Sequence, residues 1–78
     1  MTKPVTLIYV AELNSRDIVT WYPVEAIHEY GDCYRIVSVN PDPEHIYWEF
    51  STDDIVRCES YQFAEGEFGL VAHNKCEV

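Results

Sequence analysis

Apolar and polar residues alternate with a period of two along most of the chain, which is the period of β-strands. Valine, isoleucine, tyrosine and tryptophan dominate these runs, and residues of this kind favour strands over helices. Proline cannot donate to a strand ladder, so Pro23 predicts that the strand over 19–30 is an edge strand or is bulged or bent at that point. A helix beginning at Pro23 is the alternative interpretation of that segment. The pattern predicts strands over residues 5–12, 19–30, 33–39, 46–50, 55–63 and 68–72.

Turn-forming residues separate these segments. Tyr30-Gly31-Asp32 is the strongest hairpin signal, and 51–54 and 64–67 are also expected to be tight turns. The two prolines in 40–44 predict a surface loop. The residues after the last strand, 73–78, are expected to form a frayed tail.

The predicted strands are short, and together they favour one curled antiparallel sheet over residues 1–78. A chain of this length buries only about 60% of its unfolded surface, so its core must depend on a few large side chains. The first strand is apolar on both faces, which predicts a central strand covered on each side. The alternation also directs Val56, Cys58 and Leu70 inward. We expect the core to contain Ile8, Val24, Tyr34, Ile36, Trp48 and Phe50.

Charge narrows the possible functions. The 78 residues carry 14 acids against 5 bases, for a formal charge of −9. The bases are scattered, whereas phosphate binding needs Lys and Arg gathered on one face, so nucleic-acid binding is disfavoured. No apolar run is long enough to span a bilayer, and no signal-peptide pattern is present. The sequence therefore predicts a cytoplasmic protein that does not bind membranes.

The cysteines are Cys33, Cys58 and Cys76. None lies two to four residues from another, so zinc-binding spacing is absent. In a cytosolic protein we expect reduced thiols. Cys33 and Cys58 lie in apolar runs and are expected to point inward, and Cys76 is expected to be exposed and able to link two chains on oxidation.

The sequence contains no catalytic or metal-binding motif. His28, His45 and His73 are spaced unlike any metal-ligand set, and no serine lies in a nucleophile motif. A thiol nucleophile would need an exposed sulfur with a lowered pKa. We therefore expect no enzyme activity, no cofactor and no metal.

Several short motifs occur in order from Trp21 onward: W-Y-P-V-E-A (21–26), Y-R-I-V (34–37), W-E-F (48–50), D-I-V-R-C (54–58) and E-G-E-F-G-L-V-A (65–72). As a set they resemble a family of small uncharacterised bacterial proteins that are similar to SH3-like barrels. The resemblance implies an all-β fold, a small SH3-like barrel of five or six short antiparallel strands. It implies no activity. Asp53 departs from the pattern, because glycine is expected there, but Asp tolerates the left-handed backbone region better than most residues.

Aromatic residues provide the only signal for function. Tyr22, Tyr30, Tyr47 and Tyr61, with Phe63, are expected at strand ends or on outward faces. Aromatic residues are enriched at protein interfaces and in peptide-binding grooves. The sequence thus favours a protein-binding module with an unknown protein partner. The alternative is that one face packs against the first strand or against a second copy of the chain.

A second hypothesis uses the charge instead. The acidic surface could act as a charge mimic or an immunity-type inhibitor that occupies a basic groove on a partner protein. Outward Ile27 and Val37 make either a monomer or a weak homodimer compatible with the sequence.

Overall fold

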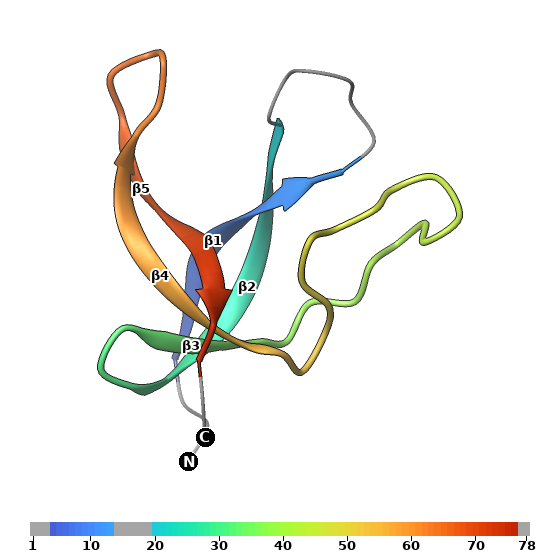
Figure 1. Ribbon diagram of the computed structural model, residues 1–78, viewed down its shortest axis with the longest axis horizontal. Coiled ribbons are helices and arrows are strands. Elements are labelled where there is room, and N and C mark those ends of the chain that lie inside the picture. The colour runs from blue at the N-terminus through green and yellow to red at the C-terminus, as the bar shows by residue number, and fades with distance from the viewer. Residues whose placement is uncertain (1–3, 14–19, 77–78) are drawn as a thin grey trace.

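The computed structural model describes residues 4–13 and 20–76, and this part of the chain contains strands, turns and loops but no helix. The strands are β1 (Val5–Glu12), β2 (Thr20–Tyr30), β3 (Cys33–Ile36), β4 (Ile55–Gln62) and β5 (Phe68–Lys75). Figure 1 shows them curling around a common interior, with the long segment between β3 and β4 projecting to one side. The predicted all-β fold is confirmed.

The sheet closes into a small SH3-like barrel in the order β1-β2-β3-β4-β5. Consecutive strands pair antiparallel, and β1 pairs with β2 along its whole length. β1 and β5 close the barrel in parallel, through the single pair Tyr9↔Val71. β2 is not an edge strand, because it pairs with β1 on one side and with β3 on the other, and no register shift occurs at Pro23. Pro23 pairs with Tyr9 of β1 and lies before the residues of β2 that pair with β3, so it has a partner strand on one side only.

Residues with positive φ make three of the turns. Gly31 (φ 52°) connects β2 to β3, and Gly66 (φ 95°) connects β4 to β5. Both hairpins were predicted. Asp53 (φ 74°) adopts the left-handed conformation in the turn before β4, so the turn forms although Asp replaces the expected glycine.

Alternate residues of the strands fill the barrel. Ile8, Val24, Ile36 and Phe50 are buried as predicted, whereas Tyr34 and Trp48 are half-buried and pack against the core from its margin. Leu70 is also half-buried and packs against the same core. The other members of the buried core cluster are Val10, Ala26, Val56, Cys58 and Ala72.

The fourth predicted strand does not form. Residues 46–50 belong to the long loop between β3 and β4, and only Trp48 makes a bridge, to Glu12. The segment still alternates, with Trp48 half-buried, Phe50 buried and Tyr47 exposed. Its backbone hydrogen bonds to the strands are limited to the end of β1 and the residue after it, where Leu13 N–H donates to Tyr47 O (2.6 Å) and Glu49 N–H donates to Ala11 O (2.8 Å). This short contact keeps the alternating directions of the side chains in 46–50 but is not long enough to form a strand pairing.

Two further expectations are wrong in detail. β1 is not covered on both faces, because Leu7 is 54% exposed while the neighbouring Ile8 is fully buried. In a barrel with no second layer outside it, the outer face of every strand meets solvent. β5 extends through Lys75, three residues into the segment expected to be a frayed tail, because its last residues pair with Val56 and Arg57 of β4.

A cross-strand ion pair forms next to the β2–β3 turn. The Nε atom of Arg35 donates to Oε2 of Glu29 at 2.9 Å. Both side chains remain partly exposed, and such a pair contributes only about 0.2–1 kcal/mol.

Candidate functional site

The tyrosines proposed from the sequence do not form one patch. Tyr22 points into the barrel margin, where its ring lies 5.4 Å from that of Trp48. Tyr30 is exposed at the β2–β3 turn and lines a shallow pocket beside Cys33 and Cys76.

The remaining two tyrosines lie at different sites. Tyr47 is exposed on the long loop, where its hydroxyl donates to the carbonyl of Glu44 at 2.6 Å. Tyr61 is 44% exposed on the outer face of β4 and belongs to a group of aromatic rings. That group is the strongest candidate for a functional surface.

We call this group the aromatic cluster and define it as Tyr9, Trp21, Tyr61 and Phe63. Ring centroids lie 4.9 Å apart for Tyr9–Phe63, 5.4 Å for Tyr61–Phe63 and 5.5 Å for Trp21–Tyr61. These are the separations and tilted orientations that aromatic pairs prefer. Tyr9 comes from β1, Trp21 comes from β2, and Tyr61 and Phe63 lie in the last residues of β4 and directly after it. Only the closed barrel therefore brings the four rings together.

A glycine makes room for the cluster. Gly69 of β5 lies opposite Tyr61, and a Cβ at this position would lie 2.7 Å from Phe63 Cε2 and 2.9 Å from Tyr9 Cε1. Real Cβ atoms do not approach other atoms so closely. The absence of a side chain at Gly69 therefore lets two rings lie on the sheet.

Glutamates border the aromatic cluster on one side. Tyr9, Trp21, Phe63, Glu65 and Glu67 line a pocket of about 250 Å³. The tight β4–β5 turn holds both glutamates near Phe63, because the N–H of Phe63 donates to the Glu67 carbonyl (2.8 Å) and that of Gly66 donates to the Phe63 carbonyl (2.9 Å). The result is a pocket with aromatic walls and an acidic rim.

A second pocket, of about 370 Å³, lies on the long loop between β3 and β4. Its apolar lining includes Leu13, Ile46, Tyr47 and Trp48. The indole Nε1 of Trp48 is the one buried side-chain nitrogen or oxygen without a hydrogen-bond partner in the described residues. The lining residues that the structure describes are all uncharged.

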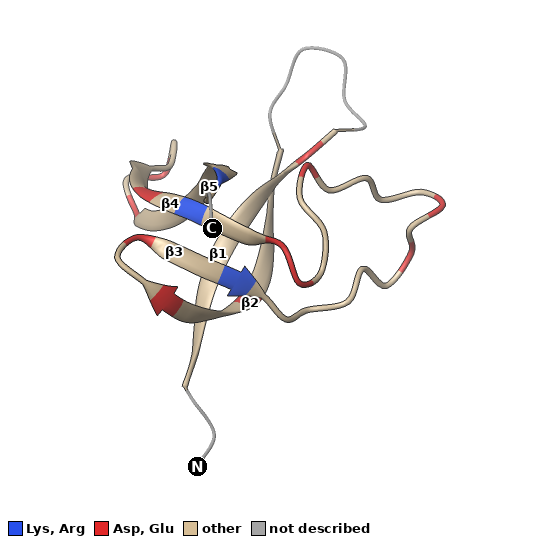
Figure 2. Ribbon diagram, turned by 60° about the horizontal axis from the view of Figure 1, so that its bottom comes forward, with Lys and Arg blue, Asp and Glu red and all other residues tan. Residues whose placement is uncertain are grey.

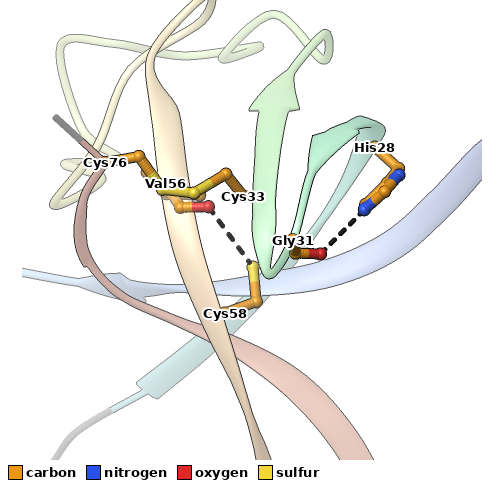
Figure 3. Close-up of a disulfide and its surroundings, with 6 residues drawn as sticks. All are labelled: His28, Gly31, Cys33, Val56, Cys58 and Cys76. Atoms are coloured by element: carbon orange, nitrogen blue, oxygen red, sulfur yellow. Dashed lines mark hydrogen bonds between the residues drawn. A yellow bond between two sulfur atoms is a disulfide. The ribbon is translucent and has the colours of Figure 1, made fainter. Parts of the chain in front are cut away.

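The cysteines differ most from the sequence prediction. Cys33 and Cys76 form a disulfide, with their Cα atoms 6.2 Å apart, whereas all three thiols were expected to be reduced (Figure 3). Cys33 is buried but lies outside the core cluster, and Cys76 is half-buried rather than exposed. The separation of 43 residues hid this pairing, because only the β3–β4–β5 register brings the two positions to either side of Ile55–Arg57.

Cys58 is the free thiol and is buried, as predicted. Its sulfur lies 4.0 Å from the carbonyl oxygen of Val56 (Figure 3). Burial, and secondarily the negative charge of Asp32, raises the pKa of Cys58 from 9.0 to about 11. The thiol is therefore protonated at neutral pH and is a poor nucleophile.

The three histidines do not form a cluster, and each one contacts a different residue. His28 Nε2 donates to the Gly31 carbonyl at 2.8 Å, His45 Nδ1 lies 3.1 Å from the Asp42 carboxylate, and His73 Nδ1 lies 3.9 Å from Glu59. Among residues 4–13 and 20–76, no group of three or more His, Cys, Asp or Glu side chains could hold a metal ion.

Comparison with protein-family models, with curated proteins and with solved structures gives no significant match. The family resemblance drawn from the motifs thus stays a prediction. In the described residues, no helix is long and apolar enough to cross a membrane.

Sequence reasoning missed Tyr9, Trp21 and Gly69. Tyr9 was assigned to a face covered by protein, and its pairing with Val71 of β5 joins distant parts of the chain. A glycine between bulky residues in a predicted strand was the available signal, because it indicates the close approach of another group.

Proposed function

We propose that this chain is a non-enzymatic protein-binding domain that docks a partner protein through the aromatic cluster. The observation that carries the proposal is the meeting of Tyr9, Trp21, Tyr61 and Phe63 on the outer surface of the barrel. Large, rigid rings contribute much of the binding energy at protein interfaces. No second layer of the described structure covers them.

The chemistry of the polar groups supports a non-enzymatic role. The free thiol of Cys58 is buried with a raised pKa, which disfavours covalent catalysis. His28 and Glu29 line one small pocket, but Glu29 is engaged with Arg35 and no thiol lines that pocket. The absence of cofactors and nucleic-acid partners stays part of the proposal.

The distribution of acids favours this proposal over a charge mimic. Acidic residues occur in the β2–β3 turn, along the long loop and in the β4–β5 turn (Figure 2). A mimic of nucleic acid needs its charges arranged in a stripe that follows the basic groove of its target. Charge spread over separate turns gives solubility and attracts basic partners more readily than it imitates a phosphate backbone.

The disulfide bears on where the domain works. A cytoplasmic location was expected from the sequence, yet disulfides persist mainly in oxidising compartments. The Cys33–Cys76 bond therefore supports an oxidising compartment. Alkylation of free thiols during cell lysis tests this point: one alkylated cysteine per chain supports it, and three indicate the reducing cytoplasm.

The test of docking compares two exposed aromatic residues on the same hairpin. Tyr61 belongs to the aromatic cluster, and Phe68 is 71% exposed outside it. Docking through the aromatic cluster is supported if a partner protein crosslinks to the wild type and to the Phe68→Ala variant but not to the Tyr61→Ala variant. Equal capture by all three would refute it. Matched thermal unfolding curves ensure that both variants are folded.

A further inference from the structure

We propose that the pocket between the aromatic cluster and the β4–β5 turn holds an arginine side chain of the partner protein. This inference rests on the proposed function, since it names the group that the docking surface recognises. Tyr9, Trp21 and Phe63 supply the walls of the pocket, and Glu65 and Glu67 supply its rim.

The rings provide faces for a cation. Tyr9 and Phe63 meet at 67°, and Trp21 and Tyr61 at 55°, so the rings do not stack flat and cover one another. A cation over an aromatic face is attracted by the ring quadrupole, and tryptophan is the best partner. Trp21, Tyr9 and Phe63 are each half-buried, so part of each side chain remains open to a ligand.

Charge at the pocket is negative and lacks a counter-charge among the described residues. Arg35 pairs with Glu29, Lys75 lies 3.7 Å from Asp54, and Arg57 lies beside the disulfide. Arg35 lies on β3, Arg57 lies near the start of β4 and Lys75 is the last residue of β5, so the latter two lie at the ends of their strands opposite the β4–β5 turn. Glu65 and Glu67 are exposed, and neither has a side-chain ion pair in the described structure. Two exposed carboxylates beside aromatic walls favour a positively charged ligand.

The combination of rings and carboxylates selects arginine over other cations. A guanidinium is planar and weakly hydrated, stacks on aromatic faces and donates to carboxylates in a fork. A lysine ammonium loses more hydration on entering an aromatic pocket. A trimethylated lysine fits aromatic walls but has no N–H to donate to Glu65 or Glu67.

The experiment titrates the full chain with the peptide acetyl-Gly-Ser-Gly-Arg-Gly-Ser-Gly-amide, and with versions carrying citrulline, lysine or trimethyllysine in place of arginine. The indole N–H signals in ¹⁵N NMR report binding: Trp21 lines the pocket, and Trp48, in the other pocket, is an internal reference. We expect millimolar binding that shifts the Trp21 signal and not that of Trp48. Citrulline, which keeps the shape but loses the charge, should bind at least about fivefold more weakly.

Matched variants test the acidic rim. Glu65→Gln/Glu67→Gln removes two charges at the pocket, and Glu44→Gln/Glu49→Gln removes two from exposed positions on the long loop. The first pair should weaken arginine binding about three- to tenfold, and the second should leave it within about twofold. Equal weakening by both pairs would show attraction by the net charge alone and overturn the proposal.

Other outcomes also decide against it. Equal binding of citrulline and arginine, tighter binding of trimethyllysine or lysine, or no Trp21 shift at about 10 mM peptide would each refute arginine recognition. The partner-capture test separates this failure from that of the proposed function. If Tyr61→Ala abolishes capture while the arginine peptide does not bind, docking stands and the arginine assignment falls. If the peptide binds but capture is unchanged by Tyr61→Ala, the docking proposal falls instead.

Discussion

Removing the Cys33–Cys76 disulfide should cost this domain a large part of its stability. The bond joins the first residue of β3 to the residue after β5, on either side of β4, and its ends are 43 residues apart in sequence. It thereby restrains more than half of the chain in the unfolded state. We expect the variant Cys33→Ala/Cys76→Ala to fold to the same barrel but to unfold much more easily.

The magnitude follows from chain entropy. Closing a loop of about 44 residues lowers the conformational entropy of the unfolded chain by the equivalent of about 4 kcal/mol at 25 °C. Measured effects of native disulfides are typically about 2–4 kcal/mol, and small domains have about 5 kcal/mol or more in total. In a domain of this size, 2–4 kcal/mol corresponds to a decrease of the unfolding temperature of roughly 10 °C or more.

Urea unfolding with and without dithiothreitol measures the effect. Reductant should destabilise the wild type by about 2–4 kcal/mol and leave Cys33→Ala/Cys76→Ala unchanged, because that variant has no bond to break. A wild type whose unfolding midpoint does not respond to reductant would refute the reasoning. So would detection of three reactive thiols in the unfolded but unreduced chain.

Three other predictions address the core, the aromatic cluster and the free thiol. In urea unfolding, Ile8→Ala should lower the free energy of unfolding by about 2–5 kcal/mol, because Ile8 is fully buried. The neighbouring Leu7 is exposed, so Leu7→Ala should change it by less than about 0.5 kcal/mol. Equal losses of stability in the two variants would contradict the barrel register. Gly69→Ala should lower the free energy of unfolding by about 1–3 kcal/mol and change the near-UV circular dichroism, because the new Cβ displaces the ring of Phe63. An unaltered spectrum would contradict the packing of Phe63 on Gly69. Because the folded-state pKa of Cys58 is raised, its contribution to stability is complete below pH 9.0 and is lost as the pH rises toward about 11. The decline of stability between these values should be smaller in Cys58→Ala, and an identical decline would contradict the raised pKa.

Local sequence signals predicted most of the architecture. A run that is apolar on both faces identified β1, the period-two alternation identified β2, β4 and β5, and Gly31 marked the hairpin between β2 and β3. These features depend on residues close together in the chain, for which the preferences of individual residue types are informative. Even the exception at Asp53 was anticipated, because Asp tolerates positive φ.

The features that were missed depend on distant residues. Residues 46–50 have the alternation of a strand, but their one strand-like pairing is the bridge from Trp48 to Glu12, and no local pattern reveals whether a partner edge exists. The disulfide likewise forms only when β3 and β5 lie on either side of β4, and the aromatic cluster forms only when β5 lies between β1 and β4. The predicted tyrosines were selected for exposure alone, and exposure does not show which rings become neighbours.

The parallel contact between β1 and β5 has a consequence for synthesis of the chain. Ile8 and Val10 lie on the first strand to leave the ribosome, and the barrel around them can close only after β5 has been made. Until then β1 has β2 on one side but no partner strand on the other. A folding intermediate in which β5 has not yet paired therefore has an open sheet edge and accessible apolar side chains, and it should associate with other chains more readily than the closed barrel.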